Sequence, residues 1–207
     1  MEKQECLEAT VCREIGARTG GEILIGVVGP VRTGKSTLIK QFMEQLVLPA
    51  IGPADAKLRA RDELPQSAAG RTIMTTEPKF IPEQAVPLQL EGGGECRIRL
   101  IDCVGYMVEG AAGHMENGAE RLVKTPWNEK EIPFTKAAEI GTKKVIHDHS
   151  TIGIVVTTDG SIGELPRNSY RAAEKKTIQE LKSIGKPFVV LVNTLSLIHI
   201  SEPTRRT

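Results

Sequence analysis

Residues 29–36 have the residue types and the spacing that bind the phosphates of a nucleotide. Their sequence, Gly-Pro-Val-Arg-Thr-Gly-Lys-Ser, matches the G-x-x-x-x-G-K-S/T phosphate loop at every required position. Glycines let such a loop curl until successive backbone N–H groups point at phosphate oxygens. Lys35 supplies a positive charge for the β- and γ-phosphates, and the hydroxyl of Ser36 is a ligand for Mg²⁺. The motif therefore predicts nucleotide binding by Gly29, Arg32, Thr33, Gly34, Lys35, Ser36 and Thr37.

Asp102 is a carboxylate placed to hold the same metal ion. It ends an apolar run and forms, with Gly105, the D-x-x-G pattern of GTPase-like folds. A carboxylate at this position holds Mg²⁺ directly or through water, and the glycine N–H approaches the γ-phosphate. The pattern is short, so its meaning comes from its position downstream of the phosphate loop. We predict an Mg²⁺ site formed by Ser36 and Asp102, with Gly105 as a further nucleotide-binding residue.

Residues 72–78 lie in a polar connection between these two motifs and carry several hydroxyl groups. GTPase-like proteins order a loop of this kind through contacts with the γ-phosphate and Mg²⁺, and a threonine makes the contact. Thr75 and Thr76 are the candidates for this role, and the alternative is that both are solvated loop residues. Lys35, Asp102 and these two threonines form the predicted set of catalytic residues.

Two expected residues of a GTPase are missing from the sequence. Tyr106 follows Gly105 at the position where many GTPases have a glutamine that orients water. The guanine-binding pattern N-K-x-D is replaced by Asn-Thr-Leu-Ser at residues 193–196. Without the aspartate, the exocyclic amine and the N1–H of guanine lose their acceptor. The sequence therefore does not support a preference for GTP, and these residues leave ATP as a second candidate nucleotide.

The elements around these motifs alternate between short apolar runs and helical periodicity. Such alternation is typical of a mostly parallel sheet with helices on both faces. We predict an α/β fold, a P-loop NTPase domain of the translation-factor-like GTPase type, in which one hairpin adds an antiparallel strand. The predicted strands are residues 23–28, 86–90, 97–101, 152–156 and 188–192; the predicted helices are 2–18, 36–48 (ended by Pro49), 134–149 and 168–184; the connections 49–87 and 105–133 are predicted to be irregular.

The composition excludes several classes of protein. A length of 207 residues suits one α/β domain, and 40% hydrophobic with 26% charged residues is ordinary for a globular chain. A net charge of +1 and an aromatic content of 3% argue against a nucleic-acid partner. The first residues lack the apolar core of a signal peptide, and no apolar run is long enough to span a membrane. We interpret the four cysteines as reduced thiols of a cytoplasmic protein.

Several segments of the chain resemble the stage IV sporulation protein A family, and they cover most of residues 20–193. They include the phosphate loop and the D-x-x-G pattern, but they extend well beyond both. The resemblance is therefore far more specific than a phosphate loop, which occurs in many unrelated families. The matching segments are residues 29–37, 62–70, 72–80, 102–106, 125–127, 149–153 and 157–160.

The resemblance implies an activity, partners and a location. The family is found in endospore-forming Firmicutes. Its members are similar to translation-factor-class GTPases but bind and hydrolyse ATP with Mg²⁺. Hydrolysis drives irreversible self-assembly into a static shell on the forespore surface, which is the base of the spore coat. The implied partners are further copies of the protein, coat proteins and a small amphipathic peptide that anchors the shell to the outer forespore membrane. The implied location is the mother-cell cytoplasm, peripheral to that membrane.

The same resemblance assigns roles to four residues. Lys35 is the phosphate-loop lysine, Asp102 is the aspartate of the Mg²⁺ site, and Thr75 and Thr76 are the sensor threonines. Two other functions remain open from the residues themselves. One is a GTPase switch of the translation-factor-related class, and the other is a scaffold that binds nucleotide without hydrolysing it.

The chain divides into three predicted parts. Residues 1–19 form an N-terminal helix, and residues 20–194 form the NTPase domain, which we expect to be incomplete at its C-terminal end and to leave an exposed sheet edge. Residues 195–207 resemble no segment of the family, and we interpret them as read-through of a sequencing adapter. The family protein is considerably longer, with a middle domain and a C-terminal region that engages the anchoring peptide.

Overall fold

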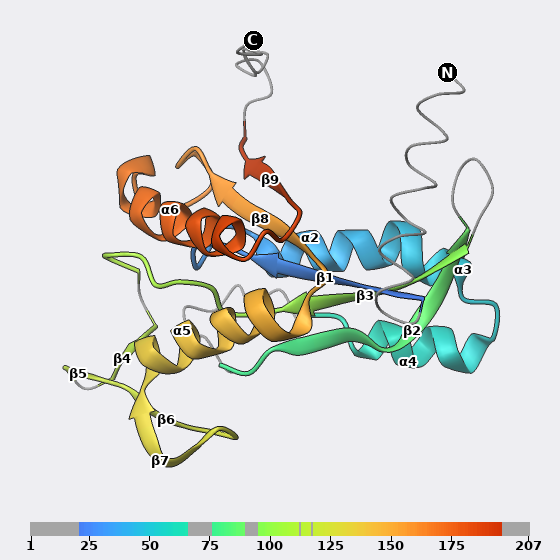
Figure 1. The fold of residues 1–207 in the computed structure, drawn as a ribbon, viewed down its shortest axis with the longest axis horizontal. Helices are drawn as coiled ribbons and strands as arrows, with labels where there is room; N and C mark the ends of the chain where they lie inside the picture. The colour runs from blue at the N-terminus through green and yellow to red at the C-terminus, as the bar shows by residue number, and fades with distance from the viewer. Residues whose placement is uncertain (1–20, 66–75, 90–94, 112, 117, 196–207) are drawn as a thin grey trace.

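A five-stranded sheet forms the centre of the computed structural model, which describes residues 21–65, 76–89, 95–111, 113–116 and 118–195 (Figure 1). Its outer strand β2 runs antiparallel to β3, and the other neighbouring strands are parallel. The mostly parallel sheet and its antiparallel hairpin strand are therefore confirmed. In spatial order the strands are β2 (Lys79–Gln89), β3 (Glu95–Asp102), β1 (Glu22–Val28), β8 (Ile152–Thr158) and β9 (Phe188–Asn193).

Helices cover both faces of this sheet, as predicted, and the alternation of side chains along β1 shows how (Figure 1). Val27 packs in one core cluster with residues of α2, η1, α3 and α4, whereas Val28 packs in another with residues of η2 and α6. Burial of one such side chain contributes about 1.5–3 kcal/mol to folding, so β1 is held from both sides. The helices are α2 (Lys35–Phe42), η1 (Met43–Val47), α3 (Leu48–Ala50), α4 (Ala54–Asp62), α5 (Phe134–Lys144), η2 (Val145–His149) and α6 (Arg167–Ser183).

The helix after the phosphate loop continues past Pro49, so the prediction that this proline ends it is wrong. α2 passes into the π-helical η1 and then into the short α3, and the chain becomes extended at Ile51. Pro49 lies in the first turn of α3, where a missing N–H costs little. The predicted helix 134–149 is confirmed, because α5 continues as the π-helical η2 to His149.

The two connections predicted to be irregular contain regular structure. α4 lies within residues 49–87, and its sequence is rich in alanine, lysine, leucine and arginine, which favour helices. Its periodicity was invisible because Ala60 is its one buried residue. β2 begins at Lys79, and its pairing with β3 shifts register between Ile81 and Val86. Residues 105–133 contain the short hairpin strands β4 (Met115–Glu116), β5 (Ala119–Glu120), β6 (Leu122–Thr125) and β7 (Asn128–Pro133).

β9 is the outer strand of the described sheet on the side opposite β2, and its apolar side chains face solvent. Val189 and Val192 are 56% and 57% exposed. The predicted helix 2–18, the hairpin turn and most of residues 195–207 lie outside the described residues. No helix in the described part of the chain combines the length and the apolar character needed to cross a membrane.

Gly26 sets how closely η2 approaches the middle of the sheet. A Cβ atom on Gly26 would lie 2.7 Å from Cβ of Ser150 and 2.9 Å from Cγ1 of Val145. We expect Gly26→Ala to lower the free energy of unfolding by about 1–3 kcal/mol, because the well-packed core must shift. Chemical denaturation measures this loss, with Gly52→Ala as the matched control, since a Cβ there meets no atom within 4 Å. Equal stability of the two variants would contradict the packing described here.

Candidate functional site

The phosphate loop connects β1 to α2 and depends on three residues with positive φ angles. Gly29 has φ 130°, Arg32 has φ 62° and Gly34 has φ 91°. A Cβ on Gly29 would lie 2.3 Å from the carbonyl oxygen of Val156, so only glycine fits there. Gly34 is the N-cap of α2, and the partial positive charge of that helix end faces the loop. The predicted context of strand, loop and helix is confirmed.

Lys35 folds back into the loop and is buried. Its Nζ donates a hydrogen bond of 2.6 Å to the carbonyl oxygen of Pro30, and the hydroxyl of Thr33 donates to the same oxygen at 3.0 Å. Burial lowers the pKa of Lys35, while the nearby Cys103 and Asp102 act in the opposite direction. A phosphate oxygen is a stronger partner for an ammonium group than a neutral carbonyl is. The loop therefore holds its cation ready for an anionic ligand.

Ser36 and Asp102 meet as predicted. β1 and β3 are parallel neighbours, with Val27 opposite Asp102, so the end of β3 lies beside the start of the phosphate loop. The Ser36 hydroxyl donates to Oδ2 of Asp102 at 2.8 Å. Burial raises the pKa of Asp102, partly offset by this hydrogen bond and by the charge of Lys35.

The second carboxylate oxygen of Asp102 suggests what the pair is for. Oδ1 is buried and has no hydrogen-bond partner among the residues that the structure describes. A buried, unpaired carboxylate oxygen is costly unless a ligand completes it. Mg²⁺ binds through one or two protein oxygens together with phosphates and water, so this oxygen beside a serine hydroxyl fits that ion. Ser36 and Asp102 are the residues that would hold it.

Gly105 lies against the phosphate loop. It has φ 92°, and a Cβ on it would be 2.1 Å from the carbonyl oxygen of Gly29 and 2.7 Å from Nζ of Lys35. The Tyr106 N–H donates to the Gly29 oxygen at 3.2 Å, and the Val31 N–H donates to the Tyr106 oxygen at 2.9 Å. Backbone hydrogen bonds of Tyr106, the residue after the D-x-x-G pattern, therefore hold this segment against the phosphate loop.

The two candidate sensor threonines differ in what the structure describes. Thr76 is buried just before β2, and a Cβ on Gly141 of α5 would lie 2.5 Å from its carbonyl oxygen. Lys79 then pairs with Asp102, which brings the threonine segment to the same end of the sheet as the site. Thr75 lies outside the described residues, so the sensor role of both threonines stays a prediction. Of the remaining predicted ligands, Thr33 is buried, whereas Arg32 and Thr37 are exposed.

Asn193 is a site residue whose role the sequence did not reveal. Its side-chain amide at the end of β9 donates to the carbonyl oxygen of Thr33 at 3.2 Å. The same nitrogen would be 2.5 Å from a Cβ on Gly34, so it sits directly against the loop. The sequence does point to this residue, because Asn193 occupies the first position of the guanine-binding pattern at a strand end. Next to it, the Thr194 hydroxyl donates to Asp159 at 2.6 Å.

We expect Asn193→Ala to weaken nucleotide binding about fivefold, which corresponds to about 1 kcal/mol for the lost hydrogen bond. The reason is that the Thr33 carbonyl loses the donor that fixes it. Titration with a fluorescent ATP analogue measures the change. Asn128→Ala, an exposed site on β7, is the matched control. Identical affinities for both variants would show that the tether to β9 is dispensable.

Comparison with known proteins agrees with this geometry. The family model described as Stage IV sporulation protein A, ATPase domain, matches residues 7–204. Stage IV sporulation protein A of Bacillus anthracis is 58% identical over 189 residues, which is 91% of the chain. The protein of the same name from Clostridioides difficile (strain 630) is 58% identical over 186 residues, or 90% of the chain. That of Bacillus subtilis (strain 168) is 56% identical over 189 residues.

The matched segment spans 38% of the length of each of these relatives. The residues that the family model matches, 7–204, contain the phosphate loop, Asp102, Gly105 and Asn193, so the candidate site lies wholly inside that match. The family model covers well over half of the chain, and the identities are high over almost all of it. The chain belongs to the stage IV sporulation protein A family, and the part of that family which it matches is the ATPase domain.

Proposed function

We propose that this chain binds and hydrolyses ATP with Mg²⁺, and that hydrolysis serves the assembly of a protein layer on the forespore. The observation that carries the proposal is the arrangement of Lys35, Ser36 and Asp102. A buried ammonium lies inside a phosphate loop, and the Ser36 hydroxyl donates to one oxygen of a carboxylate whose other oxygen has no partner in the described part of the chain. Each group faces a charge of an Mg²⁺–triphosphate complex: the ammonium matches the phosphates, and the carboxylate matches the cation.

The chain's own groups account for much of the chemistry. The loop N–H groups and the N-terminus of α2 stabilise negative charge on the phosphates, and Lys35 adds a full positive charge. Bound Mg²⁺ supplies further neutralisation of the β- and γ-phosphate oxygens. Gly105 lies against the phosphate loop beside Lys35, where its backbone N–H would approach the γ-phosphate. We propose that Thr75 or Thr76 orients the attacking water, because the position after Gly105 is a tyrosine.

ATP is the proposed nucleotide because the acceptor for guanine is missing. Asn193 of the N-K-x-D pattern is kept and is used to fix the phosphate loop. Thr194 replaces the lysine and donates its hydroxyl to Asp159. The order β2-β3-β1-β8-β9, with an antiparallel β2, also supports our proposal that the domain is of the translation-factor-like GTPase type.

Assembly, partners and location are proposed from the family to which the chain belongs. The named relatives are sporulation proteins, and their matched segment is an ATPase domain. We propose that the whole protein polymerises with its own copies as the base of the spore coat. Its further partners are coat proteins and a small amphipathic membrane-anchoring peptide. The proposed location is the mother-cell cytoplasm, at the outer forespore membrane.

Steady-state turnover of ATP and GTP tests the catalytic proposal. We expect ATP to be hydrolysed in preference to GTP, and we expect Lys35→Ala and Asp102→Asn each to lower kcat at least about a hundredfold. The first variant removes the cation that would meet the phosphates, and the second removes the carboxylate charge that would hold Mg²⁺. Lys130→Ala, an exposed lysine on β7, serves as control and should retain full activity. A preference for GTP would favour a nucleotide switch instead.

Sedimentation after incubation with nucleotide tests the assembly proposal separately. We expect the protein to pellet with ATP and Mg²⁺, and Lys35→Ala to stay in the supernatant because its loop loses the cation that meets the phosphates. Pelleting of the Lys35→Ala variant with ATP would uncouple assembly from hydrolysis. Nucleotide binding without turnover, together with pelleting, would identify a scaffold that uses ATP as a structural ligand.

A further inference from the structure

Tyr106 connects the phosphate loop to the helical layer through two different parts of the same residue. Its backbone N–H and carbonyl bond Gly29 and Val31 of the loop, at 3.2 Å and 2.9 Å. Its side chain is 4% exposed and its hydroxyl donates to the carboxylate of Glu180 on α6. A residue with both kinds of contact can transmit a displacement of α6 to the loop.

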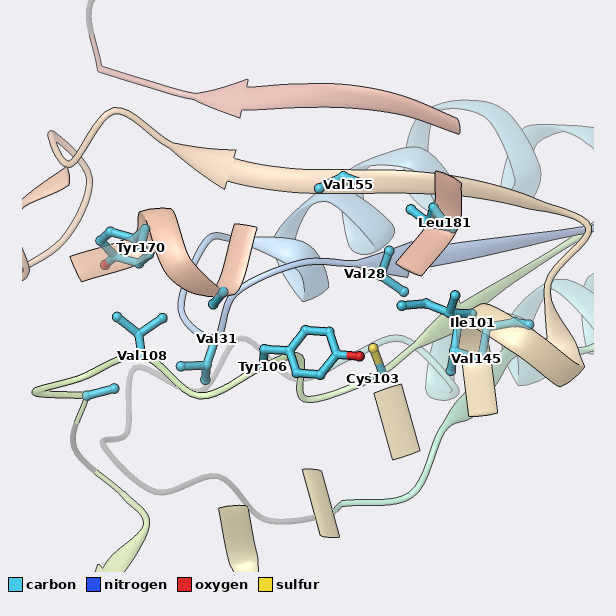
Figure 2. Packing of buried hydrophobic residues seen from close by; sticks show 13 residues of the cluster. Val28, Val31, Ile101, Cys103, Tyr106, Val108, Val145, Val155, Tyr170 and Leu181 are labelled. Carbon is cyan, nitrogen blue, oxygen red and sulfur yellow. The ribbon is translucent and has the colours of Figure 1, made fainter. Parts of the chain in front are cut away.

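The tyrosine ring lies against α6, whose Lys176 also bonds α5. Nζ of Lys176 on α6 lies 4.6 Å from the ring centroid and also donates to Glu139 on α5 at 2.9 Å. Burial, followed by the bond to Glu180, raises the pKa of Tyr106, so its hydroxyl keeps its proton and remains a donor. Figure 2 shows the hydroxyl directed away from Val31 of the phosphate loop. The side chain therefore does not orient water at the phosphates.

A displacement of Tyr106 would move Gly105, the residue that precedes it. The space for Gly105 is bounded by the Gly29 carbonyl and by Nζ of Lys35, with no room even for a Cβ. A backbone in such a tight position is sensitive to small shifts, and reacting groups misplaced by 1 Å lose much of their effect. Tyr106, which bonds α6 through its side chain, therefore directly follows Gly105, the residue that we propose to meet the γ-phosphate.

We propose that Tyr106 is a positioning residue for ATP hydrolysis, and that its hydroxyl bond to Glu180 fixes the Asp102–Gly105 segment against the phosphate loop. The proposal rests on the proposed ATPase function. It gives the position after the D-x-x-G pattern a role different from that of a water-orienting glutamine.

Tyr106→Phe in the purified protein tests this role, since it keeps the ring and removes only the hydroxyl. We expect kcat to fall about tenfold while the Kd for a fluorescent ATP analogue changes less than about twofold, because the loop itself is intact. Glu180→Ala should give the same loss, and the double variant should be no slower than either single variant, since both substitutions break the same Tyr106–Glu180 bond. Tyr170→Phe removes the chain's other tyrosine hydroxyl as the matched control and should turn over normally.

Hydrogen exchange of the backbone amides in residues 103–107 gives a second measurement that does not depend on turnover. We expect Tyr106→Phe and Glu180→Ala to lose protection from exchange there. The melting temperatures of both variants should stay near that of the wild type. In Tyr106→Phe, Glu180 keeps a cationic neighbour, because Lys143 lies 3.9 Å from it. Unchanged exchange, or wild-type kcat in an active protein, overturns the proposal. An inactive wild type would instead refute the ATPase function, and the exchange result would still decide whether Tyr106 positions this segment.

Discussion

The parallel pairing of β1 with β3 and β8 is the constraint from which the site follows. Parallel strands end at one edge of a sheet, and groups that follow them converge there. The phosphate loop follows β1, Asp102 ends β3, and Asn193 ends β9, the next strand beyond β8. A one-residue shift in register between β1 and β3 would separate Ser36 from Asp102 and would move the side chains of the shifted strand from one core cluster to the other. The chemistry of the site and the packing of the core thus rely on the same backbone hydrogen bonds.

Burial gives the site its electrostatic character. Lys35 and Asp102 both lie out of water, and burial acts against the charged form of each. Their mutual attraction and the Ser36 hydroxyl recover only part of that cost. A ligand that brings a cation to the carboxylate and anions to the ammonium would offset the remaining cost of burying the two charges. The tight glycine positions serve the same end, because Gly29 and Gly105 allow backbone to replace solvent around the charges.

Contacts close in sequence were predicted correctly from the sequence, whereas several elements and contacts that depend on the tertiary structure were not. The loop, its flanking strand and helix, and the meeting of Ser36 with Asp102 were predicted correctly, because each depends on contacts close in sequence or on strand order. α4 was missed because it buries almost nothing, so its pattern has no apolar stripe. The first half of β2 was missed because its strand character comes from pairing with β3 and not from alternation. The role of Asn193 was missed because its partner, Thr33, is far away in the sequence.

The amino-acid sequence by itself determined the family, the candidate phosphate loop and the candidate metal ligands, because each is recognised from residue types at fixed positions within short segments. The tertiary structure alone decided which carboxylate oxygen of Asp102 is left for a cation, and that Asn193 fixes the phosphate loop. It also decided that Tyr106 turns its side chain to Glu180 on α6. These contacts join segments that only the packing of α6, β3 and β9 around β1 brings together. No local pattern encodes them, because their free energy depends on burial and distance in the folded chain.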